Sequence, residues 1–329
     1  MFEILFLGTS ASAPSVHRGL SAQIVMHNEH RFLIDCGEGT QRQILQSGVG
    51  FKRLNRILIT HAHLDHILGL AGLISTFTRW EAIDFIEIYA GKNALERIHD
   101  LVYGIVLRGA KPPMPIHFIP IKAGKLFDEK DFTVTAFPVQ HRGADCFGFA
   151  FEEKSRRPFL NEKADALDVP FGPERSRLVK GDAVRLKNGV VINPEQVLGE
   201  LQIGTKFIFI GDAGRTNDLV DMCRDADGLV IESTYIEEEA DIAKQFGHLT
   251  AKQAATLARD AGVKNLLLTH ISRRYRERQV REEAKTVFQN TFVARDFDFF
   301  QITRGKVERR EDKTFEEDDD GAETIRQIE

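Results

Sequence analysis

A dense group of metal-binding side chains follows one apolar run in "RILITHAHLDHILGLAGLI", residues 56–74. His61, His63, Asp65 and His66 lie within six consecutive positions. Residues two apart on a helix point to nearly opposite faces, so His61 and His63 could share a metal only in an extended or loop segment. We therefore predict a strand at 56–60 whose carboxyl end carries the group, and a helix from about His66. Sites of α/β proteins usually lie at such strand ends.

Short apolar runs of strand length recur along the chain, with helical patterns between them. They predict strands at 2–8, 21–27, 31–37, 56–60, 84–90, 132–139, 146–152, 206–212, 228–233 and 265–270. The helical patterns lie near 39–47, 93–103, 250–261 and 276–289. This alternation indicates an α/β fold, and 329 residues with 42% hydrophobic content can bury a large core in one domain or two fused halves.

Three further donors stand at the ends of predicted strands. His141 follows "FTVTAFPVQ", Asp212 ends "KFIFIGD" and His270 ends "KNLLLTH". Each alone would be interpreted as a strand-end cap or a hydrogen-bonded core histidine. Together with the first group they form a set of imidazoles and carboxylates that suits zinc.

A long segment between 152 and 206 interrupts the alternation and exceeds an ordinary connection. Asn188-Gly189 in "RLKNGVVI" predicts a hairpin within it. We interpret 154–200 as an arm inserted into a domain that spans 1–307. Residues 151–200 carry nine basic and nine acidic side chains, so composition alone does not predict RNA binding.

The formal net charge of −5 is concentrated at the carboxyl end. Residues 308–329 hold ten acidic and four basic side chains, which leaves a net charge of +1 for residues 1–307. We predict a disordered acidic tail at 308–329 and only local basic surface elsewhere.

Cysteine use and hydropathy give the expected compartment. Cys36, Cys146 and Cys223 are scattered and form no CxxC pair, which favours a reducing cytoplasm. No apolar run approaches the roughly 18 residues expected of a membrane span.

At the level of motifs, the chain resembles the ribonuclease Z family, the transfer-RNA 3′-processing endonucleases, in its short form. The resemblance covers about residues 1–304 and rests on "LGTSASAP", "DCGEGTQRQIL", "THAHLDHILGL", "FPVQHRG", the Gly-Pro arm, "FIGDAG", "GHLTAKQAA" and "THISRRY". It implies the metallo-β-lactamase fold, an αββα sandwich with two metals between the sheets, here with an inserted flexible arm.

The resemblance also implies roles for individual residues. Two Zn²⁺ ions per subunit, or Mn²⁺ or other divalent ions in their place, would be held by one set of ligands. The set comprises His61, His63 and His141 for one ion, Asp65, His66 and His270 for the other, and Asp212 as the bridge. Asp65 would also orient or deprotonate the attacking water. His248 would protonate the leaving oxygen; its alternative interpretation is a cap on the helix that begins near Thr250.

Substrate contacts are implied at two places. Arg274 would bind phosphate, although Arg273 stands where relatives more usually have a small residue, which leaves open which arginine faces the substrate. The arm would grip precursor transfer RNA far from the cut. Its proposed contacts are Gly172, Pro173, Arg175, Arg177 and Lys180. In the family the arm of one subunit serves the active site of the other, which implies a homodimer.

The implied function is a zinc-dependent endoribonuclease that removes the 3′ trailer from precursor tRNA and leaves a 3′-hydroxyl. Two other classes stay open. One is a phosphodiesterase or arylsulfatase-like hydrolase of small substrates with the same fold. The other is a non-catalytic RNA-binding or scaffolding protein. For the arm alone, the alternative interpretation is a solvated segment or one that packs in a dimer.

Overall fold

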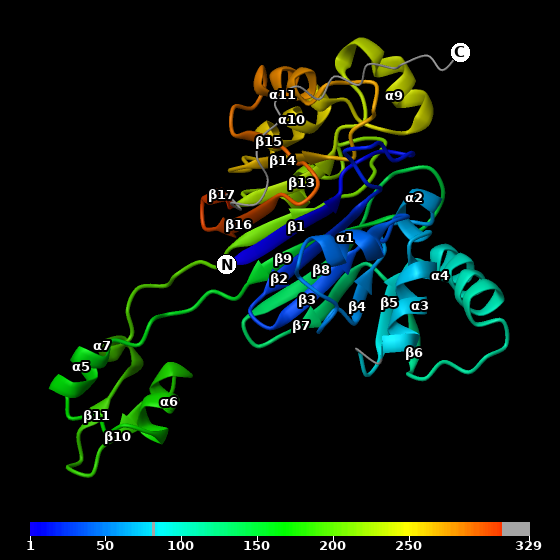
Figure 1. Cartoon of the computed structure of the whole chain (residues 1–329). Coiled ribbons are helices and arrows are strands. Elements are labelled where there is room, and N and C mark those ends of the chain that lie inside the picture. Colours follow the sequence, from blue (N-terminus) through cyan, green and yellow to red (C-terminus); the bar gives the residue numbers. More distant parts are fainter. Residues whose placement is uncertain (81–82, 311–329) are drawn as a thin grey trace, which may run out of the picture.

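The computed structural model describes residues 1–80 and 83–310. Two large sheets lie face to face and helices cover their outer faces (Figure 1). This is the predicted αββα sandwich.

The first sheet has eight strands, of which β3 to β6 run parallel. In spatial order they are β17 (Lys306–Arg310), β16 (Phe299–Thr303), β1 (Phe2–Gly8), β2 (Ala22–His27), β3 (His30–Ile34), β4 (Arg56–Leu58), β5 (Ile86–Ala90) and β6 (Ile116–Pro120). The predicted domain limit at 307 is wrong by three residues, because β17 pairs with β16 through Arg310. The rest of the predicted tail, 311–329, lies outside the described residues.

The second sheet has seven strands, of which β12 to β15 run parallel. In spatial order they are β15 (Thr291–Val293), β14 (Leu266–Thr269), β13 (Gly228–Glu232), β12 (Lys206–Phe209), β9 (Phe147–Glu153), β8 (Phe132–Pro138) and β7 (Gly124–Asp128). The sequence patterns predicted the central strands of both sheets but missed β6, β7 and β15 to β17.

Alternating side chains explain why the sheets stack. In β1, Phe2, Ile4 and Phe6 point into a core between the two sheets, whereas Leu5 and Leu7 point to the helices. Phe149 and Phe151 of β9 face the same inner core. A strand apolar on both faces must be covered on both, which gives four layers.

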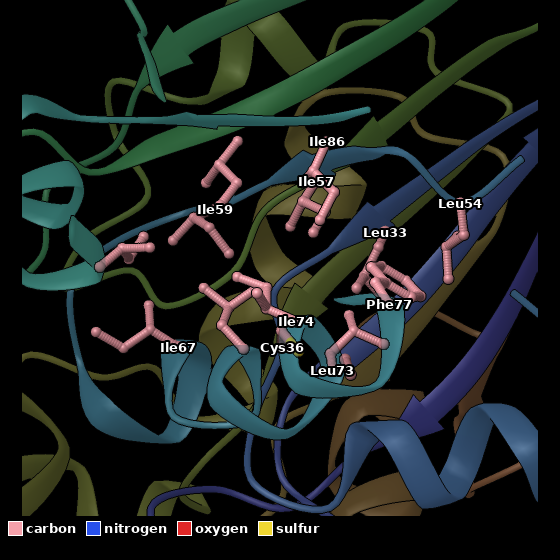
Figure 2. Packing of buried hydrophobic residues seen from close by; sticks show 14 of the residues in the cluster. Leu33, Cys36, Leu54, Ile57, Ile59, Ile67, Leu73, Ile74, Phe77 and Ile86 are labelled. Atoms are coloured by element: carbon pink, nitrogen blue, oxygen red, sulfur yellow. The ribbon is translucent and has the colours of Figure 1, made fainter. Parts of the chain in front are cut away.

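The outer layers are helical. Over the first sheet lie α1 (Thr40–Gln46), α2 (Leu64–Ile67), α3 (Leu70–Trp80), α4 (Lys92–His99) and the π-helix η1 (Asp100–Leu107). Figure 2 shows Leu73, Ile74 and Phe77 of α3 packed against Leu33 and Ile57 of the sheet. Over the second sheet lie α8 (Val220–Cys223), the 3₁₀-helix η2 (Glu237–Glu239), α9 (Ala240–Phe246), α10 (Ala251–Asp260) and α11 (Glu277–Lys285). No helix in the described ranges is long and apolar enough to cross a bilayer.

The inserted segment forms a separate arm that leaves the body on two extended stretches (Figure 1). These stretches pair through backbone hydrogen bonds between Arg156 and Gln202. The arm contains α5 (Asn161–Ala166), α6 (Pro173–Val179), β10 (Val184–Arg185), β11 (Val191–Ile192) and α7 (Pro194–Val197). The predicted hairpin is confirmed, with Gly189 at φ 85° in its turn. A small core of its own, including Leu178 and Val197, holds the arm together.

Candidate metal centre

The predicted donors converge at the edge where both sheets present the ends of their strands. β4 leads to His61 through His66, β8 to His141, β12 to Asp212 and β14 to His270. The segment 61–63 is extended, as the spacing of His61 and His63 required, but the following helix α2 begins at Leu64 instead of His66. The seven donors thus come from the ends of four strands.

One group of donors surrounds one oxygen of Asp212. His61 Nε2 and His141 Nε2 each lie 3.6 Å from Asp212 Oδ2, and His63 Nδ1 lies 3.3 Å from His141 Nε2. These four ligand atoms all lie within 4.8 Å of one another. The arrangement is compact enough for a single cation to contact all four.

A second group surrounds the other oxygen of the same carboxylate. His66 Nε2 and His270 Nε2 each lie 3.4 Å from Asp212 Oδ1, and Asp65 Oδ2 lies 3.4 Å from His270 Nε2. Asp212 therefore directs one oxygen to each group, which is the geometry of a bridging carboxylate.

Buried atoms without partners show that the groups fit cations. His61 Nε2, His66 Nε2 and Asp212 Oδ1 are buried and have no hydrogen-bond partner among the described residues. Unsatisfied buried polar atoms cost free energy, so a cluster of them that all point to one space requires a ligand. Nitrogen and carboxylate donors in fours suit a divalent ion such as zinc.

Four ligand histidines are oriented through their other ring nitrogen. The contacts are His66 Nδ1 with Asp35 (2.7 Å), His61 Nδ1 with Thr60 (3.0 Å), His141 Nδ1 with the Gly247 carbonyl (2.7 Å) and His270 Nδ1 with Thr234 (2.9 Å). Such contacts fix the ring and leave Nε2 free to bind a metal.

Electrostatics keep the donors in forms that bind cations. Burial lowers the pKa of His61 well below its usual value, which favours the neutral imidazole. Burial opposes ionisation of Asp65, but its hydrogen bond with His270 and the charge of His66 nonetheless lower the pKa of this carboxyl. Both effects favour metal binding over proton binding.

His248 lies beside the first group and is paired with a buried carboxylate. Its Nδ1 is 3.8 Å from Asp212 Oδ2 and within hydrogen-bonding distance of Glu232. Burial lowers the pKa of His248, but the Glu232 charge and hydrogen bond outweigh it and raise the pKa to about 9. The ring is therefore cationic at neutral pH. Thr250 caps α10, which removes the alternative interpretation of His248 as the cap.

The loop after β1 contacts the second group. The Ser12 backbone N–H donates to Asp65 Oδ2 at 2.9 Å, and Ser12 adopts a positive φ of 59°. Ala11 donates its N–H to the carbonyl of Ile271, next to His270. The loop "GTSASAPS" is thus hydrogen-bonded to two segments that carry donors of the second group.

Arg274 lies at the surface, with 55% of its side chain exposed. Its Nη1 is 3.2 Å from a carboxylate oxygen of Glu239, which also accepts a hydrogen bond from the Tyr275 hydroxyl. Arg273 is exposed as well. The phosphate contact of Arg274 stays a prediction.

The arm residues divide into two kinds. Gly172 adopts a φ of 118° and Pro173 opens α6, while Arg177 and Lys180 are exposed. The prediction for Arg175 needs correction, because its guanidinium is buried within the arm. It donates to the Val169 carbonyl and to Asn161 and pairs with Asp165, so it is not free to bind a phosphate.

Sequence reasoning missed two buried carboxylates of the centre. Glu232 ends β13 and Asp35 follows β3, each after an apolar run. The signal that identified Asp212, a charged residue that ends such a run, was present at both.

Comparisons with known proteins agree with this geometry. The family described as "Anti-Pycsar protein Apyc1" matches residues 2–159, and the beta-lactamase superfamily domain matches residues 183–271. Ribonuclease Z of Bradyrhizobium diazoefficiens is 45% identical over 302 residues, which cover 92% of this chain and all of that protein. Ribonuclease Z of Archaeoglobus fulgidus is 39% identical over 92% of this chain and 98% of its own length.

A solved structure gives the same result. The crystal structure of human tRNase Z, short form, superposes with a TM-score of 0.63 at 27% identity and covers 91% of this chain and 99% of its own. Metallo-β-lactamase architecture, converging donors and near-complete coverage of the relatives lead to one conclusion: the chain belongs to the ribonuclease Z family.

Proposed function

We propose that this chain is a zinc-dependent endoribonuclease that removes the 3′ trailer of precursor tRNA and leaves a 3′-hydroxyl. The observation that carries the proposal is the Asp212 carboxylate, which directs one oxygen to each of two donor groups in a member of the ribonuclease Z family. A pair of divalent ions there would polarise the phosphodiester and lower the pKa of a water molecule.

The ligand assignment follows the two groups. His61, His63 and His141 would hold one ion, and Asp65, His66 and His270 the other. Asp212 would bridge them.

The chain's own residues supply proton transfer. Asp65 Oδ2 is held by the Ser12 N–H and lies beside His270, so its ionised carboxylate can orient the attacking water and accept its proton. His248, kept cationic by Glu232, can donate a proton to the leaving ribose oxygen. The base is thus deprotonated and the acid protonated at neutral pH, which are the states that the two roles need.

The proposed task of the arm is to bind a large RNA substrate at a distance from the cut. The body would bind the acceptor end, and the exposed Arg177 and Lys180 of the arm would contact the RNA backbone far from the cut. We propose a homodimer in which each arm serves the neighbouring centre, and a cytoplasmic location.

The decisive experiment is cleavage of a 5′-labelled precursor tRNA with Zn²⁺ or Mn²⁺ supplied. We expect one cut near the discriminator base and a product whose terminus is oxidised by periodate, the mark of a free 3′-hydroxyl with its vicinal 2′-hydroxyl. Asp212→Ala should abolish the cut and lower the bound metal measured by elemental analysis.

Two outcomes would contradict the proposal. An active, metal-replete Asp212→Ala variant would refute the assigned centre. Cleavage of a small chromogenic phosphodiester without any cleavage of precursor tRNA would favour the small-substrate hydrolase instead.

A further inference from the structure

An unusually exposed aromatic ring stands at the start of α6 in the arm. Phe171 is 79% exposed, more than any other phenylalanine of the described chain, and Phe246 follows at 40%. The guanidinium carbon of Arg175 lies 3.6 Å from the centroid of the Phe171 ring. One side of the ring is therefore covered by a flat cation, while much of the rest faces solvent.

The cation beneath the ring is fixed in place. Arg175 is only 8% exposed, and its nitrogens donate to Val169 O at 2.8 and 3.2 Å and to Asn161 Oδ1 at 3.0 Å. It also pairs with Asp165. These in-plane contacts use the edge of the guanidinium and leave its face for Phe171. The buried arginine thus holds the exposed ring.

The surroundings of the ring favour a nucleic acid. Arg177 lies on α6 and Lys180 directly follows this helix, and both side chains are exposed. Among residues 1–80 and 83–310, neither has a carboxylate within ion-pair distance. An aromatic face next to unneutralised cations is the usual construction for stacking a base and contacting its phosphates.

We propose that Phe171, backed by Arg175, is a stacking platform for an exposed nucleobase of the folded RNA substrate. This inference rests on the proposed function and deepens it, because it adds a contact to a base face at a distance from the cut. It also gives Arg175 a positioning role in place of the predicted phosphate contact.

Folded RNA limits which base can occupy the platform. Bases within a helical stack have no open face, so an unflipped base is available only where a stack ends. In tRNA one such end is the acceptor terminus, which must lie at the metal centre. The others are the anticodon loop and the corner of the L, where the D and T loops meet. The corner is nearer to the acceptor terminus than the anticodon loop is, so we place the platform at the corner.

The test compares three variants on precursor tRNA. Phe171→Ala should raise KM by about 5- to 100-fold, the effect expected for loss of one stacked base, with kcat unchanged. Phe171→Trp should keep KM within about twofold, because indole also stacks. Val179→Ala is the matched control, since Val179 is an exposed apolar residue at the other end of α6. It should behave as wild type.

A shortened substrate locates the contact. A minihelix with only the acceptor and T arms lacks the corner, so Phe171→Ala should cleave it as wild type does. An unchanged KM of Phe171→Ala on full precursor tRNA would refute the stacking role of Phe171. An equal loss on tRNA and minihelix would overturn its placement at the corner. A change in sedimentation of Phe171→Ala would show that the ring is a subunit contact instead.

A binding measurement separates this inference from the proposed function. Mature tRNA, which is not cleaved, should quench the added fluorescence of Phe171→Trp relative to wild type. If mature tRNA quenches Phe171→Trp but the wild-type protein cleaves no precursor tRNA, the proposed nuclease function is refuted and the stacking role of Phe171 is supported. If the wild-type protein cleaves precursor tRNA but no quenching occurs, the stacking role is refuted and the nuclease function is supported.

Discussion

Nδ1 of His248 lies 3.0 and 3.1 Å from the two carboxylate oxygens of Glu232, and both side chains are buried. The Glu232 carboxylate also accepts hydrogen bonds from the Ala213 and Leu249 backbone N–H groups. Its position is thus fixed by the backbone, and its negative charge stabilises the imidazolium.

This pair predicts a shift in pH dependence. Protonated His248 is the proposed acid, so kcat should fall as pH rises through its pKa of about 9. Glu232→Gln removes the charge that raises this pKa, so the alkaline limb should move to lower pH. The measurement is a pH profile of kcat on precursor tRNA, whose leaving ribose oxygen needs a proton. An alkaline limb that does not move in Glu232→Gln would show that His248 is not the proton donor.

A second prediction concerns the carboxylate behind a metal ligand. Asp35 accepts a hydrogen bond from His66 Nδ1 at 2.7 Å and from the Thr60 N–H at 2.8 Å. Asp35→Asn should lower metal affinity about 10- to 100-fold, because it removes the charge that orients and polarises His66. Asparagine tolerates the positive φ of 57° at this position, so the fold should persist. Metal retained during titration with a chelator is the measurement, with circular dichroism as the control.

Retention of wild-type metal affinity by a folded Asp35→Asn protein would contradict this prediction. The hydrogen bond to His66 would then be dispensable.

A third prediction tests the close packing that positions α2. A Cβ atom at Gly69 would lie 1.9 Å from the carbonyl oxygen of Gly37, a backbone atom that cannot move aside alone. Gly69→Ala should therefore destabilise the fold by about 1–3 kcal/mol or more. Gly104→Ala is the matched control, because a Cβ there meets nothing within 4 Å. Urea unfolding of both variants is the measurement, and equal midpoints would contradict the prediction.

Local patterns predicted that the seven donors lie near strand ends, where the structure brings them together. That local pattern decides both the strand and the residue at its end, as Asp212 and His270 show. The same pattern at Glu232 and Asp35 did not lead to a predicted role, because a single carboxylate after a strand can serve many structural purposes. Only the fold shows that these two side chains meet His248 and His66.

Arg175 shows what sequence could not supply. In "GPERSRLVKG" it differs little from Arg177, yet one guanidinium is buried and the other exposed. Their difference arises from the packing of α6, which turns Arg175 and Leu178 inward to the arm's core. The contacts of Arg175 with Asp165 and Phe171 depend on the tertiary packing of the arm, which no local sequence pattern encodes.

A last prediction follows from the independence of the arm. Its apolar core consists of arm residues alone, and its two connecting stretches run side by side, with Leu160 N–H bonded to Val197 O at 2.8 Å. Residues 160–195 can therefore be replaced by a short glycine linker without pulling on β9 or β12. The truncated protein should hydrolyse a small phosphodiester as wild type does but cleave precursor tRNA poorly, because the distant phosphate contacts are gone. Added salt should weaken RNA binding by the full-length protein more than by the truncated one, since fewer phosphate contacts remain to be screened. Equal losses on both substrates would show that the arm supports the body instead of gripping the RNA.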